Sequence, residues 1–227
     1  MAHIRNRDLC EVNRACEQSD RFVLSDVTAR PFECLQFLRG TMDLYLDIGY
    51  GTAEFHSLLD MVHEFYLEDI RNWCASDVDG IFFMDDWGGN RQLLIDPRTW
   101  REVFKPLYKE YCDIIHATGK YAFFHSDGNI QAIFGELIEV GIDAINSQLF
   151  AMDIEELATM YRGEVSFWGE IDRQHVLPLG AREEVVDAVR RVRGALDDGI
   201  GGVIAQCEWG MDDPNDNIRA VFEAWLN

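Results

Sequence analysis

Short apolar runs alternate with longer amphipathic stretches along most of this chain, and this alternation limits the folds that the chain can adopt. Six runs are predicted to be strands because they are short and rich in β-branched and aromatic residues. Each is almost continuously apolar, which is typical of parallel strands that helices bury on both faces. The predicted strands span residues 21–27, 79–84, 120–125, 144–148, 165–169 and 201–205.

The stretches between these strands carry the apolar spacing of helices. Asp96 and Asp213 each precede a proline, which predicts a capped helix start. Glycines expected at helix ends are Gly119, Gly141 and Gly163. The predicted helices span residues 52–75, 97–117, 130–140, 153–160, 182–197 and 214–226. This repeating β-α order fits both a doubly wound sheet and a (β/α)8 barrel.

Side chains that can bind a metal or act in catalysis follow nearly every predicted strand. One apolar run delivers His125 and Asp127 into a Gly-Asn turn, and the last run ends beside Cys207, so together they suggest a metal site. The other strand ends carry Asp85 with Asp86, Asn146 with Gln148, and Glu170. Such a ring at the carboxyl ends of consecutive strands favours the barrel, because a doubly wound sheet gathers its site at one switch point. Six strands are two fewer than a complete barrel has.

Length and composition predict one globular domain, residues 1–227, in which residues 1–30 form an irregular or rearranged amino end. The apolar stretches are too short to cross a membrane, and the first eight residues lack a signal-peptide pattern, so we expect a cytoplasmic protein. The net charge of -21 disfavours nucleic acid and anionic membrane surfaces as partners. The six cysteines lack CxxC spacing and are expected to be mainly reduced core thiols.

Each candidate residue also has a purely structural interpretation. His125 and Asp127 are either ligands or a hydrogen-bonded pair that shapes the turn, with Asp127 capping the helix that follows. Cys207 is either a ligand or an inert buried thiol. Asp85 is open between acid-base work and a turn position, whereas Asp86 is expected to be a solvated turn carboxylate. Aromatic residues at helical spacing are expected in the core, namely Trp73, Trp100, Phe104, Tyr108 and Tyr111.

Several motifs resemble those of the uroporphyrinogen decarboxylase superfamily, in order from about residue 31 to the end. They are residues 80–88 (GIFFMDDWG), 125–129 (HSDGN), 141–148 (GIDAINSQ), 168–172 (WGEID), and Asp213-Pro214 with Asn217. The resemblance implies a (β/α)8 barrel. Members are usually longer at the amino end, so this chain is expected to lack the first strands. A partner subunit or a rearranged amino end is then expected to cover the exposed strand edges, which implies a homo-oligomer.

The superfamily holds two chemistries. Its decarboxylases need no cofactor and share an arginine-rich amino-terminal segment and a late Gly-His-Gly loop, neither of which this sequence has. The strand-end ring also offers no cationic donors for a substrate that bears many carboxylates. The other branch uses zinc to activate a thiol that takes a methyl group from a corrinoid protein. Its zinc motif is similar to His-x-Cys-Gly-Asn with a later Cys, so His125 and Cys207 match, and Asp127 replaces a Cys. Aspartate can ligate zinc, but it also admits harder divalent metals or none.

The resemblance therefore implies a metal-dependent methyltransferase that acts with a corrinoid carried by a partner protein and a thiol acceptor. Glu170 or Asp85 would complete the coordination or act as a base. Asn129, Asn146 and Gln148 would orient a small-molecule substrate. A cofactor-free uroporphyrinogen decarboxylase is the alternative. A non-catalytic barrel remnant that serves as a binding module is a second alternative, because part of the active-site wall is expected to be missing.

Overall fold

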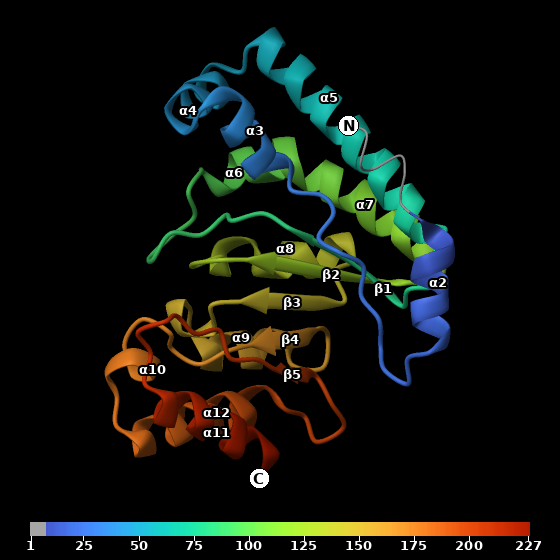
Figure 1. Cartoon of the computed structure of the whole chain (residues 1–227). Coiled ribbons are helices and arrows are strands. Elements are labelled where there is room, and N and C mark those ends of the chain that lie inside the picture. The colour runs from blue at the N-terminus through green and yellow to red at the C-terminus, as the bar shows by residue number, and fades with distance from the viewer. Residues whose placement is uncertain (1–7) are drawn as a thin grey trace. The chain divides into compact units, whose positions relative to one another are not determined.

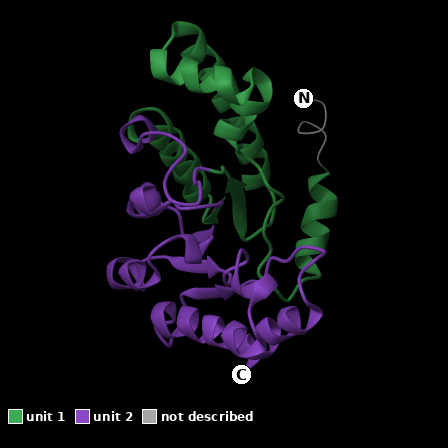
Figure 2. Cartoon of the chain, turned by 90° about the vertical axis from the view of Figure 1, so that its left-hand side faces the viewer, with its two compact units in different colours: residues 1–86, 101–125 green, residues 87–100, 126–227 purple. Residues whose placement is uncertain are grey.

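The computed structural model describes residues 8–227, whose contacts group them into two compact units. The first unit comprises the chain up to residue 86 together with residues 101–125, and the second comprises residues 87–100 and 126–227 (Figure 2). The irregular amino end expected at residues 1–30 lies partly outside the described residues, and from Leu9 to Glu17 it forms helix α2.

The first unit packs helices around two parallel strands. Strand β1 (Gly80–Met84) pairs with β2 (Tyr121–Ser126) (Figure 1). The register places Met84 opposite His125. The long helix α5 (Ala53–Cys74) contacts two neighbouring helices and β1. The remaining helices are α3 (Pro31–Arg39), α4 (Thr41–Tyr50) and α7 (Lys105–Ala117). Because β1 ends one residue before β2 in this register, the residues that follow the two strands start from the same edge.

The second unit repeats the same alternation of strands and helices. Strand β4 (Ser166–Gly169) pairs in parallel with β3 (Ala144–Ser147) on one side and with β5 (Val203–Ala205) on the other. Helices α11 and α12 enclose an apolar cluster that includes Ile171 and Leu177. Its helical elements are α6 (Pro97–Thr99), α8 (Gln131–Val140), η2 (Leu149–Ala151), α9 (Ile154–Tyr161), α10 (Val176–Leu179), α11 (Arg182–Leu196) and α12 (Asn215–Leu226). The pairs formed by the named strands of each unit are parallel and helices follow them, so the predicted α/β class is confirmed.

The first predicted strand, residues 21–27, is the main departure from the sequence prediction. It is extended and lies beside β1, but it forms only one isolated bridge, Leu24 with Gly80. Side chains interrupt its ladder: the amide of Val23 donates to Asp79 Oδ2 at 2.7 Å, and the amide of Phe82 donates to Ser25 Oγ at 2.9 Å. Hydrogen bonds to side chains replace part of the backbone pairing, so this segment is not a regular strand.

The predicted helix at residues 97–117 is divided into α6, a π-helical turn η1 (Trp100–Phe104) and α7. Pro106 stands in the first turn of α7, where its missing N–H breaks the continuous helical ladder. Asp96 caps α6 as predicted, accepting from the amide of Arg98 at 2.7 Å. The cap predicted at Asp213 is wrong, because its carboxylate accepts from the amide of Gly210 and α12 has no side-chain cap.

The other predicted helices are confirmed to within a residue or two at their ends. The five aromatic residues expected in the core are all buried. Among the described residues, no helix is both long and apolar enough to cross a membrane.

Candidate metal centre

Two glycines let the loops after β1 and β2 pack backbone against backbone. The amide of Gly88 donates to Asp127 O at 3.1 Å, and the amide of Asn129 donates to Gly89 O at 2.8 Å. A Cβ at Gly88 would lie 2.5 Å from Asp127 O, and Gly128 has a φ of 74°. Only glycine fits this close approach. The two loops therefore fix the backbone on either side of Asp127.

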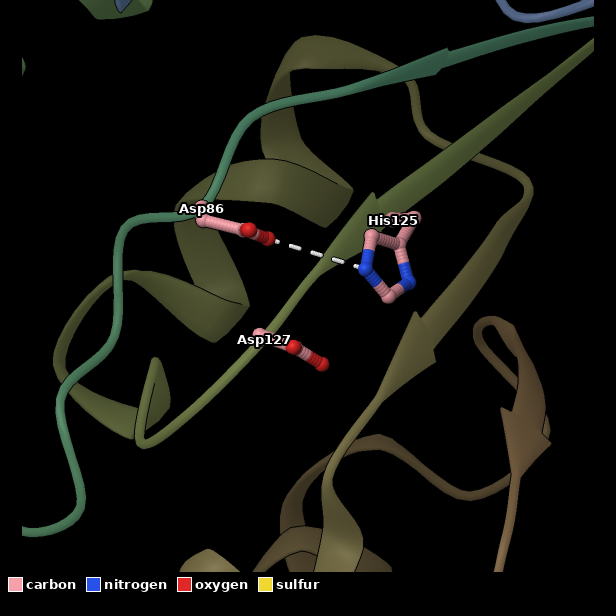
Figure 3. A group of neighbouring side chains, drawn as sticks. All are labelled: Asp86, His125 and Asp127. Carbon is pink, nitrogen blue, oxygen red and sulfur yellow. Dashed lines mark ion pairs between the residues drawn. The ribbon is translucent and has the colours of Figure 1, made fainter. Parts of the chain in front are cut away.

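His125 stands at the end of β2 and faces a carboxylate from the loop after β1. Its Nε2 atom lies 3.6 Å from Asp86 Oδ1 (Figure 3). Asp127 follows two residues along the chain, and the three side chains each offer a ligand atom within 4.8 Å of the others. Asp86 was expected to be a solvated turn carboxylate, but the structure pairs it with the histidine. One imidazole nitrogen and two carboxylates thus form a group that has metal-ligating chemistry.

Arg173, in the loop after β4, binds three carboxylates of the second unit. Its Nη2 atom donates to Asp127 Oδ2 at 2.6 Å, its Nε lies 3.6 Å from Glu170 Oε1, and its Nη1 pairs with Glu208. The Arg173 side chain is 19% exposed. Burial lowers the pKa of the guanidinium, but the three carboxylates outweigh burial and raise it. The prediction that the strand ends carry no cationic group is therefore wrong, although this cation is fully engaged by acidic partners.

Glu170 is 4% exposed and lies on the wall of a cavity in the second unit. Burial raises the pKa of its carboxyl, Arg173 lowers it, and Glu208 and Asp127 raise it, so that the pKa is about 8. Its Oε2 atom has no hydrogen-bond partner among the described residues. The cavity has a volume of about 330 Å³ and is also lined by Gln148, Arg91 and Arg173. Glu170 is therefore suited to hold a proton at the cavity wall.

Cys207 lies in the loop after β5 and packs against the apolar cluster of α11 and α12. Burial, together with the charges of Glu170 and Asp213, raises the pKa of its thiol to about 11. The thiol thus stays protonated at neutral pH in the metal-free chain. Among the described residues, Cys207 does not belong to the group formed by Asp86, His125 and Asp127. Its predicted role as a ligand stays a prediction.

Asp85 is fully buried in the first unit and anchors the start of α3. It accepts from the amides of Phe32 and Glu33, both at 2.9 Å, and from the Tyr108 hydroxyl at 2.6 Å. Burial raises the pKa of Asp85 and outweighs the Tyr108 hydroxyl and the two amides, which lower it, so that the pKa is about 8. These contacts give Asp85 a structural task, and its predicted catalytic role stays a prediction.

The three amides predicted to bind substrate have different surroundings. Asn129 donates to Ala151 O at 2.7 Å and accepts from the amide of Gln131, the first residue of α8, whereas no side chain caps α8. Asn146 donates to Trp168 O at 2.8 Å and also to Gln206. Gln148 lines the cavity beside Glu170. Of the three, Gln148 is the one whose position suits contact with a ligand.

Comparisons with known proteins agree with this fold. The sequence model described as "Uroporphyrinogen decarboxylase (URO-D)" matches residues 15–226, nearly the whole chain. The chain belongs to the uroporphyrinogen decarboxylase family. No curated protein matches it.

Among solved structures, this uroporphyrinogen decarboxylase family chain is similar to a methyltransferase from Methanosarcina mazei. The TM-score is 0.74 at 14% sequence identity, and the match covers 94% of this chain and 61% of that chain. At this identity the likeness concerns the fold alone. It confirms an α/β fold of the family's type. The chain spans less than two thirds of the methyltransferase chain that it matches.

The residues of this family member fit a divalent metal. His125 offers a nitrogen and Asp86 and Asp127 offer oxygens, a set that suits zinc and also harder ions such as manganese. Asp127 and Glu208 alone carry more negative charge than Arg173 carries positive charge, which further favours a cation. The donor set is thus harder than the His-Cys-Cys pattern implied by the resemblance.

Sequence reasoning missed Arg173 and underrated Asp86 in this uroporphyrinogen decarboxylase family chain. Arg173 stands four residues beyond the end of β4. A basic residue so close to a strand end was the signal that could have placed it in the site. The parallel register of β1 with β2 places Met84 opposite His125, so the loop that carries Asp86 starts beside the end of β2, and that register is not visible in the sequence.

Proposed function

We propose that this chain carries the metal-binding part of a methyltransferase that works with a corrinoid methyl carrier on a partner protein and a thiol acceptor. The observation that carries the proposal is the group of Asp86, His125 and Asp127, whose ligand atoms lie within 4.8 Å of one another. The fold likeness to a protein named a methyltransferase supports it. The match covers 61% of that longer protein, so methyltransferase activity is proposed for this chain and rests on more than the fold likeness.

In this proposal His125, Asp127 and Asp86 hold the metal, and Cys207 is a further candidate ligand. Zinc or another divalent ion would act as a Lewis acid that lowers the pKa of a substrate thiol. Glu170 holds a proton at the cavity wall and passes it to or from a bound ligand, because its raised pKa of about 8 lies near neutral pH. Gln148 orients a small-molecule substrate by neutral hydrogen bonds.

The charge of the strand ends favours this function over decarboxylation of a porphyrinogen. A substrate with many carboxylates needs free cationic donors. Two arginines line the cavity, Arg91 and Arg173, which are few for such a substrate. Arg173 already serves Asp127, Glu170 and Glu208, so this cluster repels a further carboxylate. We also propose that the protein forms a homo-oligomer and is cytoplasmic. The six free thiols of the structure fit a reducing compartment.

Metal analysis tests the proposal. Protein purified without chelator should contain about one divalent ion per chain, and the metal-free protein should bind Zn²⁺, Co²⁺ or Mn²⁺ in a titration. His125→Ala, Asp86→Asn and Asp127→Asn should each weaken binding by more than about tenfold, because each removes a ligand. The exposed Asp212→Asn is the matched control and should bind as the unmodified chain does. A metal-free protein that releases carbon dioxide from a porphyrinogen at full rate would reverse the proposal.

A further inference from the structure

We infer that Arg173 is the positioning residue of this site: its guanidinium fixes Asp127 in the orientation that binds metal and ties that loop to the loops after β4 and β5. The inference rests on the proposed function, because it assigns a role toward the metal held by His125, Asp86 and Asp127. Arg173 itself would not touch the metal.

Three different nitrogens of Arg173 meet three carboxylates from three loops. Nη2 donates to Asp127 Oδ2 at 2.6 Å, Nη1 pairs with Glu208, and Nε lies 3.6 Å from Glu170 Oε1. The planar guanidinium has donors in fixed directions, so it can hold several carboxylates in one geometry. A lysine ammonium keeps the charge but lacks this fork. The arrangement therefore depends on the shape of Arg173 as well as on its charge.

The loop that carries Arg173 is itself held in place. Asp172 Oδ1 accepts from the amides of Gln174 at 2.8 Å and His175 at 2.9 Å, and the Asp172 carbonyl accepts from Leu177 at 2.8 Å. These bonds form a closed turn directly after Glu170. Arg173 thus starts from a fixed backbone, and it reaches Asp127, whose backbone is fixed by Gly88. Both ends of the Arg173–Asp127 contact are preorganised.

A role of Arg173 through its charge and a role through positioning Asp127 predict opposite effects on metal affinity, so the inference can be tested. If Arg173 acted only through its positive charge, removing it would tighten the binding of a cation. If it positions Asp127, loss of the guanidinium shape should weaken binding even when the charge is kept. Residues that orient metal ligands typically contribute about 10- to 100-fold to metal affinity.

The experiment compares the unmodified chain with Arg173→Lys, using metal-free protein titrated with Zn²⁺ against a chelator of known affinity. We expect Arg173→Lys to lose about tenfold or more in affinity. We also expect its Co²⁺ absorption spectrum to change, because the geometry around the ion is altered. Arg173→Ala should bind weakly too, and millimolar guanidinium should restore part of its affinity. Asp212→Asn is the control, and thermal unfolding checks that each variant is folded.

The outcomes separate this inference from the proposed function. If the unmodified chain binds no divalent metal, both are overturned. If it binds metal and Arg173→Lys binds equally well with the same Co²⁺ spectrum, the positioning role is overturned and the metal site stands. Should Arg173→Lys fail to fold, Glu208→Gln serves instead, since Glu208 is half exposed and its loss frees one side of Arg173. A loss of affinity smaller than that of Arg173→Ala is then expected, and unchanged affinity contradicts the inference.

Discussion

Asp85 illustrates how one buried side chain organises a helix that lies far away in the sequence. Three donors surround its carboxylate, two of them amides of the first turn of α3. Asp85→Ala should lower the free energy of unfolding by about 3–5 kcal/mol, because it leaves these buried donors without an acceptor. Denaturant unfolding measures this loss. Asp86→Asn, one residue away, should weaken metal binding with little change in stability. A folded, fully stable Asp85→Ala that has lost turnover would instead favour the catalytic role.

Cys207 should react slowly although it lies in a loop. Burial, Glu170 and Asp213 raise the pKa of its thiol to about 11, so the reactive thiolate is scarce at pH 8. We expect alkylation, resolved by peptide mass spectrometry, to modify the exposed Cys10 at least about tenfold faster than Cys207 in the metal-free protein. Equal rates at the two cysteines would mean that Cys207 is accessible and ionised. Full protection of Cys207 by added Zn²⁺ would favour its role as a ligand.

At the scale of elements, the loops after β1 and β2 behave as one unit because their backbones touch. Gly88→Ala places a Cβ 2.5 Å from Asp127 O, so the backbone must shift. We expect a loss of about 2–4 kcal/mol in stability and a weaker metal site, since Asp127 moves with its loop. Gly89→Ala is the matched control, because its nearest atom is 3.4 Å away. Metal titration and thermal unfolding of both variants check this, and equal behaviour of the two would contradict it.

The spacing of apolar residues predicted most helices and strands, because each of them buries its apolar side chains in the core. The structure of residues 21–27 was harder to predict. The side chains of Asp79 and Ser25 accept hydrogen bonds there from the amides of Val23 and Phe82, which are distant from them in the sequence. The same limit applies to the site. His125 and Asp127 are neighbours in the sequence and were predicted together, whereas the partners Asp86 and Arg173 depend on strand register and on a loop turn. Local chemistry is visible in a sequence, but pairing across elements is not.

At the scale of the whole molecule, buried carboxyl groups link stability to pH. Burial raises the pKa of Asp85 and of Glu170 to about 8, and the unfolded values are about 3.9 and 4.3. Between these limits the folded chain binds more protons than the unfolded chain. The stabilising contribution of each group is therefore fully present below about pH 4 and is lost as the pH rises through about 8. The net charge of -21 adds repulsion among surface carboxylates, which salt screens.

We therefore expect the free energy of unfolding to fall between about pH 5 and pH 9, with a slope of at most about 1.4 kcal/mol per pH unit for each buried carboxyl. Urea unfolding in high salt measures this slope with surface repulsion suppressed. Glu170→Gln removes one titrating group at the cavity wall and should flatten the slope. The exposed Glu183→Gln should leave it unchanged. A slope that Glu170→Gln does not alter, or stability that rises over this range, would mean that Glu170 is already ionised in the folded chain. It would then be a charged partner of Arg173 and would hold no proton for the chemistry at the cavity.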